Sequence, residues 1–371
     1  MSLATTLQPD SINSLVSQSL LDTKNDVEAV LSKEKPSLHD LPTLLSPAAE
    51  AYIEVMASRA HALTVQRFGY TMQLFAPMYI SNECYNTCTY CGFSMEHKYK
   101  RKTLNPSEIK DEVDVLKAKG FDHILVLTGE SPKAVDANFI ANSIDHIAPH
   151  FSSVSIEVQP LSEDEYKMLI GRGVDSLTLY QETYHPEAYA KYHLFGLKKD
   201  YQNRLDASER GAKAGFYRIG LGALLGLHDW RYDSLALSQH LGYMRKHYWQ
   251  TKYSVSFNRI NDMFGEFTPE YSVSDSNLVQ LITAFRLVFP DLSITMSTRE
   301  PRQLRDNLIP LGITTMSAES NTAPGGYSGQ EEEKQFEISD ERSLDEVKEL
   351  LISKGYEPVV KDWDASYISV R

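Results

Sequence analysis

Three cysteines within eight residues could hold a metal centre, and they are the most informative feature of this 371-residue sequence. Cys84, Cys88 and Cys91 follow the pattern C-x3-C-x2-C, and the sequence contains no other cysteine. An odd, clustered set of thiols argues against a disulfide framework and for a metal site. Three thiolates on a four-iron cubane leave one iron open to a small-molecule ligand, as catalytic metal sites do. The spacing therefore predicts a catalytic 4Fe–4S cluster.

Two other interpretations of the cysteines stay open at this point. The first is a zinc site with His97 as the fourth ligand, although structural zinc sites usually use two well separated C-x2-C pairs. The second is a set of buried, inert cysteines, but chance would rarely produce this spacing. The neighbouring residues suit a cluster, because Gly92 permits close backbone approach and Tyr90 supplies a bulky shield.

Polar side chains stand where other apolar runs of the chain end. Gly129 opens the backbone after one such run, and Glu130 can accept a hydrogen bond from an ammonium group. For any single residue, a loop or capping role explains it equally well, but the whole set points to a site. Its other members are Glu157, Gln159, Gln181, Glu182, Asn258, Arg259, Arg299, Glu300, Ser317 and Ser320.

Eight apolar runs alternate with amphipathic segments, which is typical of a (βα)8 barrel. The predicted strands cover 74–80, 123–128, 153–158, 176–180, 217–224, 253–257, 292–296 and 313–316. The predicted helices between them cover 106–119, 162–172, 201–214, 274–288 and 302–308. A doubly wound sheet would usually place a Gly-rich phosphate loop after the first strand, where this chain has its cysteines. Chemistry in a barrel lies at the carboxyl ends of the strands, so the polar strand ends would meet there.

The regions outside the barrel suggest three parts. We predict that residues 1–70 form a helical layer, in which Ser46 caps a helix and Pro47 occupies its first turn. Residues 71–328 would form the α/β barrel of the TIM type. Residues 329–371 would form a short C-terminal extension that packs on the barrel and contains a helix over 344–353.

The composition excludes some function classes. The formal charge is −13, and such a surface repels phosphate backbones, so we expect no binding to nucleic acid. The most apolar stretch, 221–227, is far too short to cross a bilayer, and residues 1–6 lack the layout of a secretory signal. We therefore expect a cytoplasmic protein without membrane association.

The motifs resemble a known family. C-x3-C-x2-C after the first strand, with Tyr90 before the last cysteine, resembles the signature of the radical S-adenosylmethionine (SAM) enzymes, and Gly129-Glu130 resembles their SAM-amine motif. From about residue 45 to the C-terminus the chain is similar to the aromatic-amino-acid lyases of this superfamily. Within them it most resembles the 2-iminoacetate synthases, the tyrosine lyases of thiamine thiazole synthesis. The similar segments are SNEC (81–84), CGFS (91–94), LTGE (127–130), EVQPL (157–161), YQETYH (180–185), RLD (204–206), GLGALLGL (220–227), STRE (297–300), GGY (325–327) and QF (335–336).

The resemblance implies a reaction, cofactors and partners. A deoxyadenosyl radical, formed from SAM by an electron from the 4Fe–4S cluster, would remove hydrogen from the amino group of L-tyrosine. The Cα–Cβ bond would then break to give p-cresol and 2-iminoacetate. The expected partners are a thiazole synthase, which would receive the iminoacetate, and a reductant such as flavodoxin or ferredoxin.

The resemblance also implies roles for individual residues. Arg204 is a candidate for the SAM carboxylate, although it could equally be a surface arginine paired with Asp206 or Glu209. Arg299, aided by Ser317 or Ser320, is expected to hold the tyrosine carboxylate, which suits a guanidinium fork. The remaining expectations are cluster binding by Cys84, Cys88 and Cys91, contact with SAM by Tyr90, Gly129 and Glu130, and ribose contacts by Glu157 and Gln159.

Related enzymes give alternatives. The tyrosine lyase of hydrogenase cofactor assembly carries extra C-terminal cysteines, which this chain lacks after Cys91. A tryptophan lyase and a deazaflavin-synthesis tyrosine enzyme share the barrel. Residues 256–261 lack an expected proline-rich form, and Glu319 stands where glycine is expected, so a lyase acting on tryptophan or another amino acid stays open. A zinc-stabilised scaffold is the non-enzyme alternative.

Overall fold

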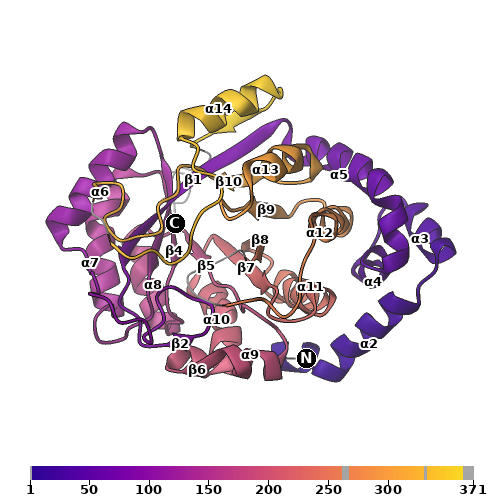
Figure 1. The fold of residues 1–371 in the computed structure, drawn as a ribbon, viewed down its shortest axis with the longest axis horizontal. Coiled ribbons are helices and arrows are strands. Elements are labelled where there is room, and N and C mark those ends of the chain that lie inside the picture. The colour runs from indigo at the N-terminus through magenta and orange to yellow at the C-terminus, as the bar shows by residue number, and fades with distance from the viewer. Residues whose placement is uncertain (1, 261–266, 330–331, 362–371) are drawn as a thin grey trace.

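Eight parallel strands close into a barrel in the computed structural model, which describes residues 2–260, 267–329 and 332–361 (Figure 1). The ring closes where β10 pairs with β1, from Gln73↔Thr315 to Phe75↔Ser317. Each strand lies on a predicted apolar run, so the predicted barrel is confirmed. The strands, in ring order, are β1 (Thr71–Ser81), β3 (His123–Thr128), β4 (Ser153–Glu157), β5 (Ser176–Thr178), β7 (Arg218–Leu225), β8 (Lys252–Arg259), β9 (Ser293–Met296) and β10 (Thr315–Ser317).

Helices surround the barrel and cover its outer face. They form because capping residues precede amphipathic runs: Ser274, for example, accepts a hydrogen bond from Asn277 N at the start of α12. The helices that were predicted are α6 (Pro106–Ala118), α8 (Glu163–Gly171), α10 (Tyr201–Ala214), α12 (Asp275–Val288) and α13 (Arg302–Leu308). Those not predicted are α7 (Ala137–Ile147), α9 (Pro186–Tyr192) and α11 (Trp230–His247).

The N-terminal residues form a helical layer along one side of the barrel. Ser46 Oγ accepts from Ala49 N at 3.2 Å and Pro47 follows it, as predicted, although the turn that begins there is a 3-10 helix. The layer packs through α5 on α12 and through α2 on α11. Its elements are α1 (Leu3–Thr6), α2 (Pro9–Leu21), α3 (Lys24–Leu31), η1 (Leu38–Asp40), α4 (Leu41–Leu44), η2 (Pro47–Tyr52) and α5 (Ile53–Phe68).

The C-terminal residues return to the barrel. After α14 (Leu344–Ser353), the short β11 (Glu357–Val359) pairs in parallel with the start of β1. Before α14, buried Asp340 forms ion pairs with Arg342 and with Arg305 of α13. Residues 330–331 and 362–371 of the predicted extension lie outside the described residues, and the division at 70 and 328 stays a proposal. No helix in the described ranges is long and apolar enough to span a bilayer.

A small second sheet holds the cysteine loop. β2 (Thr87–Cys88) pairs antiparallel with β6 (His193–Phe195), and both lie outside the barrel wall. α9, β6 and η4 (Leu197–Lys199) are inserted between β5 and α10. The insertion thus brings residues 186–199 against the loop that follows β1 (Figure 1).

Candidate active site

The ends of two neighbouring strands position the cysteine loop. Gly129 N, at the end of β3, donates to Ser81 O at 2.9 Å, and Tyr85 N donates back to Glu130 O at 2.8 Å. A Cβ atom on Gly129 would lie 2.3 Å from Glu83 O, closer than any real contact, so the two chains meet only because this residue is glycine. The backbone after Cys84 is therefore held by the segment that follows β3 and contains Glu130.

Cys88 is buried, and Cys84 and Cys91 are half-buried beside it. Burial raises the pKa of Cys84 to about 11, and the neighbouring Cys91 and Glu130 add to the effect. Burial likewise raises the pKa of Cys88 and of Cys91. A thiolate in such a place needs a nearby cation, which a metal centre supplies.

The loop fits a cluster better than a single ion. Across the described ranges, no three His, Cys, Asp or Glu side chains are grouped to bind one metal ion, and His97 is exposed. Zinc needs such a compact tetrahedral set, which the described residues do not form around the three thiols. Three thiols in one loop instead suit a cluster that keeps one iron open. Gly92 allows the chain at Lys334 to approach the cysteine loop, because a Cβ on residue 92 would lie 2.5 Å from Lys334 O.

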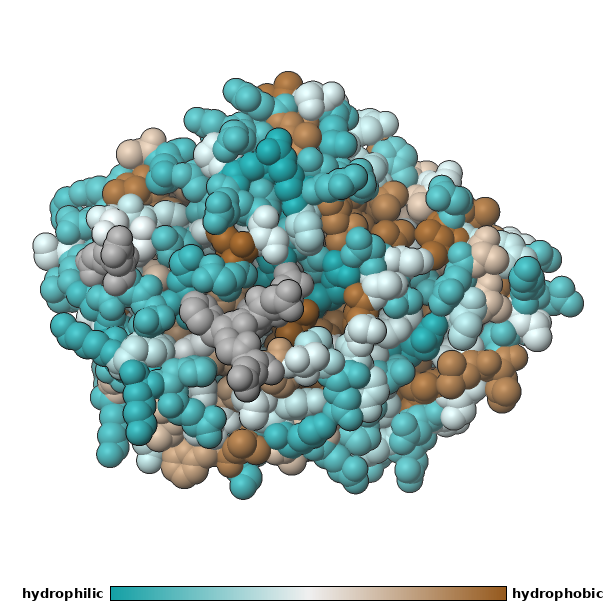
Figure 2. Space-filling model, viewed as in Figure 1, coloured by the Kyte–Doolittle hydropathy of each residue, from teal (hydrophilic) through white to brown (hydrophobic). Residues whose placement is uncertain are grey.

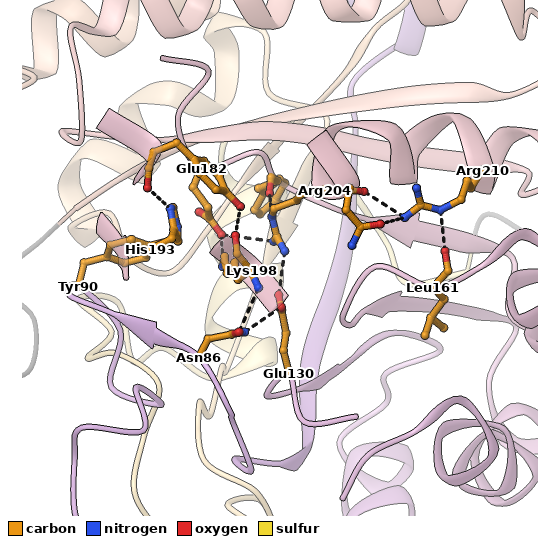
Figure 3. A network of polar contacts seen from close by, with 12 residues as sticks. Asn86, Tyr90, Glu130, Leu161, Glu182, His193, Lys198, Arg204 and Arg210 are labelled. Carbon is orange, nitrogen blue, oxygen red and sulfur yellow. Dashed lines mark hydrogen bonds and ion pairs between the residues drawn. The ribbon is translucent and has the colours of Figure 1, made fainter. Parts of the chain in front are cut away.

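A buried polar network lies beside the loop (Figure 3). Arg204 Nη1 donates to Glu130 Oε1 at 2.8 Å, and Asn86 Nδ2 donates to Glu130 Oε2 at 2.9 Å. Arg204 Nε donates to Tyr180 O at 2.7 Å, and the residue is only 5% exposed. The surface role for Arg204 is therefore wrong. Its alternative partners are engaged elsewhere: Asp206 accepts from Gln202, and Glu209 accepts from Tyr243 and Tyr248.

A second ion pair adjoins the first. Lys198 Nζ lies 2.7 Å from Glu182 Oε1, and Lys198 N donates to Asn86 Oδ1 at 3.1 Å. Burial and Arg204 lower the pKa of Lys198, but Glu182 and the Cys88 thiol outweigh them and raise it. Glu182 holds a left-handed backbone, with φ of 70°, which costs energy in a residue other than glycine. The loop after β5 is thus held in a strained shape that turns Glu182 toward Lys198.

A cavity opens at the carboxyl ends of the strands, beside Cys91. It encloses about 900 Å³ of space, part of it open to solvent. Eight predicted site residues line it: Tyr90, Cys91, Glu157, Glu182, Asn258, Arg299, Ser317 and Ser320. The aromatic and apolar lining includes Phe75, Tyr79, Leu127, Tyr180, Leu224 and Phe336.

Arg299 lines the same cavity. Its guanidinium lies over the Phe336 ring, 3.4 Å from the centroid, and burial lowers its pKa. Ser317 Oγ accepts from Thr298 N at 3.1 Å and so braces the same strand end. Ser320 Oγ is buried and has no hydrogen-bond partner in the described structure. A ligand with two acceptor oxygens would suit these donors.

Family models match two parts of the chain. The Radical SAM superfamily matches residues 78–236, and the Biotin and Thiamin Synthesis associated domain matches residues 256–357. A 2-iminoacetate synthase of Salmonella typhimurium is 46% identical over 345 residues, which is 92% of each chain. One of Escherichia coli is 44% identical over the same share of both chains. This chain belongs to the radical SAM 2-iminoacetate synthase family.

Solved structures agree with this family. The FeFe-hydrogenase maturase HydG from Carboxydothermus hydrogenoformans superposes with a TM-score of 0.91 and 30% identity, over 98% of this chain and 86% of that one. Methylornithine synthase (PylB) superposes with a TM-score of 0.72 and 21% identity, over 93% and 99%, and supports the fold alone. Membership of the radical SAM superfamily confirms the expected cofactors, a 4Fe–4S cluster and SAM.

Glu157 and Gln159, the two residues predicted to contact the ribose of SAM, lie in different places. Glu157 lines the cavity, where burial, with a contribution from Glu182, raises its pKa to about 7. Gln159 is buried behind it, and its Nε2 donates to Val135 O at 3.2 Å. Its Oε1 has no partner within the described part of the chain. The ribose role of both residues stays a prediction.

Tyr90 is buried beside Cys88, and its predicted role as a shield of the synthase site stays a prediction. Its ring is 7% exposed and packs in one apolar cluster with Cys88, Tyr192 and Leu224. Its hydroxyl hydrogen-bonds His193 Nε2 at 2.8 Å.

Sequence reasoning missed three polar residues of the site. Lys198 follows β6, outside the barrel, so no strand-end argument could find it. Tyr79 OH donates to Gln335 Oε1 at 2.6 Å, and Gly92 N donates to Gln335 O at 3.0 Å. Tyr79 carried a signal, because it alternates with buried β1 residues at a strand end. Gln335 belonged to a similar segment, but nothing in the sequence joined it to the cysteine loop.

Proposed function

We propose that this protein is a carbon–carbon lyase that cleaves the Cα–Cβ bond of L-tyrosine to 2-iminoacetate and p-cresol, for the thiazole moiety of thiamine. The single observation that carries the proposal is a cavity with Cys91 on one wall and Arg299 on another. The high identity to 2-iminoacetate synthases over 92% of the chain supports it. Cys84, Cys88 and Cys91 would hold the cluster, which together with SAM would supply the radical chemistry.

The chain's own residues would bind and orient the amino acid. Arg299 offers two parallel N–H groups to the carboxylate, and the Phe336 ring beneath keeps the guanidinium plane in place. Ser320 Oγ adds a hydroxyl that is free to donate. The aromatic and apolar wall, which includes Tyr180 and Leu224, suits the phenol ring.

The reaction balances as follows. Tyrosine loses a hydrogen atom from its amino group, and the Cα–Cβ bond then breaks to leave 2-iminoacetate and a 4-hydroxybenzyl fragment. That fragment gains one electron and one proton to become p-cresol, so a one-electron reductant is required. Methionine and 5′-deoxyadenosine are the products from SAM.

The decisive experiment is anaerobic. The protein is reconstituted with iron and sulfide, mixed with SAM, reductant and tyrosine, and the products are followed by mass spectrometry. p-Cresol together with 5′-deoxyadenosine is the expected result. Deoxyadenosine with an indole product from tryptophan, and no p-cresol from tyrosine, would overturn the tyrosine assignment.

Two matched variants test the cluster. Cys88→Ala should lose bound iron and SAM cleavage, because two thiolates remain for a cluster that needs three. His97→Ala should keep both, because His97 is exposed and outside any metal group in the described residues. Equal iron loss in the two variants would contradict the three-cysteine cluster, and zinc near one per chain in place of iron in the parent protein would restore the zinc alternative.

Arg299→Ala tests the carboxylate site. We expect the tyrosine KM to rise by the equivalent of about 2–5 kcal/mol, because the substrate carboxylate would lose its charged partner. Arg299→Lys should recover part of this, since it restores the charge without the fork. An unchanged KM in both variants would remove Arg299 from the substrate site.

The partners and compartment belong to the same proposal. A thiazole synthase would take up the iminoacetate, and a flavodoxin or ferredoxin would supply electrons. A cytoplasmic location is supported by the three free thiols, which suit a reducing compartment. Co-purification with a thiazole synthase would test the first point.

A further inference from the structure

Exposed apolar side chains gather over the cysteine loop. Among the described residues, eleven large hydrophobic side chains are substantially exposed, and five of them lie in two adjoining segments. Apolar side chains are visible at the lower edge of the molecule, where β6 lies (Figure 2). We call the five residues the loop patch: Tyr85, Met95, Leu194, Phe195 and Leu197, which are 41–54% exposed.

Ring and backbone contacts hold together the segments that carry the loop patch. The Tyr85 and Phe195 rings lie 5.4 Å apart, and Phe195 is the strand partner of Thr87. Met95 N donates to Asn86 O at 2.9 Å, which brings the second part of the cysteine loop to the first. Gly196, with φ of 88°, lets the chain fold onto this loop, because a Cβ there would lie 2.1 Å from Asn86 Oδ1.

The loop patch lies next to the cluster ligands. Tyr85 follows Cys84 directly in the chain, and Cys88 pairs with His193, the residue before Leu194. Neighbouring strands stand about 4.8 Å apart, so the patch begins roughly one strand spacing from a ligand backbone. Electron transfer between proteins needs a short path of this kind.

The charge around the loop patch contrasts with the rest of the protein. Residues 84–102 and 191–200 contain seven Lys or Arg and two acidic residues, in a chain whose net charge is −13. Three of these lysines are already paired with carboxylates outside the two ranges: Lys102 with Glu108, Lys191 with Glu270 and Lys198 with Glu182. Lys98, Lys100 and Lys199 are exposed in the same segments, against exposed Glu96 and Asp200. This excess of exposed lysine favours a partner that carries negative charge.

We propose that the loop patch is the docking surface of an acidic one-electron carrier protein that reduces the cluster. An apolar centre with a basic rim suits the small, transient interfaces of electron-transfer complexes. The proposal depends on the cluster and not on tyrosine as the substrate. The docking proposal can therefore fail while the proposed lyase reaction stands, and the lyase reaction can fail while the docking proposal stands.

The test measures reduction of the reconstituted cluster by stopped-flow absorbance, without tyrosine. The donors are a bacterial flavodoxin in its hydroquinone form and, separately, dithionite. Leu197→Glu should slow reduction by flavodoxin about tenfold or more, because it adds repulsion and removes apolar contact. Lys199→Glu should slow it less, by about threefold, and flatten its dependence between about 0.05 M and about 0.5 M salt. Reduction by dithionite should stay unchanged in both.

Matched controls lie on α14, far from β6 in Figure 1. Ile352→Glu and Lys354→Glu make the same two changes at exposed positions and should leave both rates unchanged. The proposal is overturned if the patch variants match these controls, or if dithionite reduction falls equally. It is also overturned if Leu197→Glu disrupts a dimer of this chain, or binding of a thiazole synthase, while flavodoxin reduction is kept.

Discussion

Glu130 and Arg204 show how single charges depend on one another in this site. Glu130 accepts from two side chains, one on each carboxylate oxygen, and both donors are buried. A charge in such a place is stable only while its partner is present. Glu130 and Arg204 are also the residues predicted to bind the ammonium and the carboxylate of SAM, and that role stays a prediction.

We predict that Arg204→Met destabilises the cluster-free protein by about 3 kcal/mol, because Glu130 is left buried without its cation. Urea unfolding measures this. The double variant Glu130→Gln/Arg204→Met should regain most of the loss, since no isolated charge then remains. A loss below about 1 kcal/mol in the single variant would show that the pair contributes little.

At the scale of elements, the approach of β3 to the cysteine loop depends on Gly129. We predict that Gly129→Ala lowers the iron and sulfide bound after reconstitution, because its Cβ would meet Glu83 O at 2.3 Å and Cys84 Cβ at 3.2 Å. Elemental analysis and visible absorbance measure the loss.

Gly171→Ala is the matched control for this change. Gly171 ends α8, and a Cβ there would have no atom within 4 Å. Alanine should be neutral or slightly stabilising at a helical position. Normal iron content in Gly129→Ala would contradict the close-approach argument.

Another element-scale contact joins α11 to the loop that carries Glu182. Buried Asp233 Oδ1 accepts from Thr183 Oγ1 at 3.0 Å and from Tyr184 N at 2.7 Å, while Oδ2 has no partner in the described ranges. Burial raises the pKa of Asp233 to about 7, which the two hydrogen bonds offset in part. The folded protein thus keeps a proton that the unfolded chain, with a carboxyl pKa of about 3.9, loses.

The stability contributed by protonated Asp233 should therefore fall as pH rises from about 4 to about 7. We predict that Asp233→Asn gains stability relative to the wild type over this window, by about 2–4 kcal/mol in total. Urea unfolding at several pH values measures it. Asp164→Asn is the control, since its side chain is 97% exposed. A difference that is flat with pH, or equal in the control, would reject the prediction.

Elements with a strong local pattern could be predicted, and others could not. The eight barrel strands are short apolar runs, and α10 and α13 begin and end where their amphipathic pattern does. α11 was missed because its buried residues run around the whole helix, including Asp233, Ser234 and His240, which hides the usual stripe. α9 was missed because it is short and interrupts the strand–helix alternation.

Some site residues could likewise be predicted from the sequence, and others could not. Their spacing alone predicts that Cys84, Cys88 and Cys91 belong to the site. Positions at strand ends predict the same for Glu130 and Arg299. The pairing of Glu130 with Arg204 joins residues 74 positions apart, and sequence alone allowed a surface role for the arginine. Such a contact depends on which helix packs behind which strand, and one sequence without relatives does not specify that.

For the whole molecule, one buried charge cluster ties the C-terminal residues to the barrel. Asp340 accepts from Arg342 Nε at 2.8 Å and from Arg305 Nη1, and Arg305 Nη2 also donates to Ser317 O. The cluster therefore connects the chain before α14 to the strand end beside the cavity.

We predict that Asp340→Ala destabilises the protein by about 3–5 kcal/mol, because two buried guanidinium groups lose their carboxylate. Urea unfolding of the cluster-free protein is the measurement. Asp114→Ala removes a carboxylate that is 56% exposed and paired with Lys110, and should change stability by at most about 0.5 kcal/mol. Equal losses in the two variants would contradict the role given to burial.

The bond between Gly92 and Gln335 has a consequence for how the protein is made. The cysteine loop leaves the ribosome more than 200 residues before the closing strand β10 and Gln335. A nascent chain therefore exposes its three thiols long before the segments that cover them are made. During that interval the thiols are open to oxygen and to other metal ions.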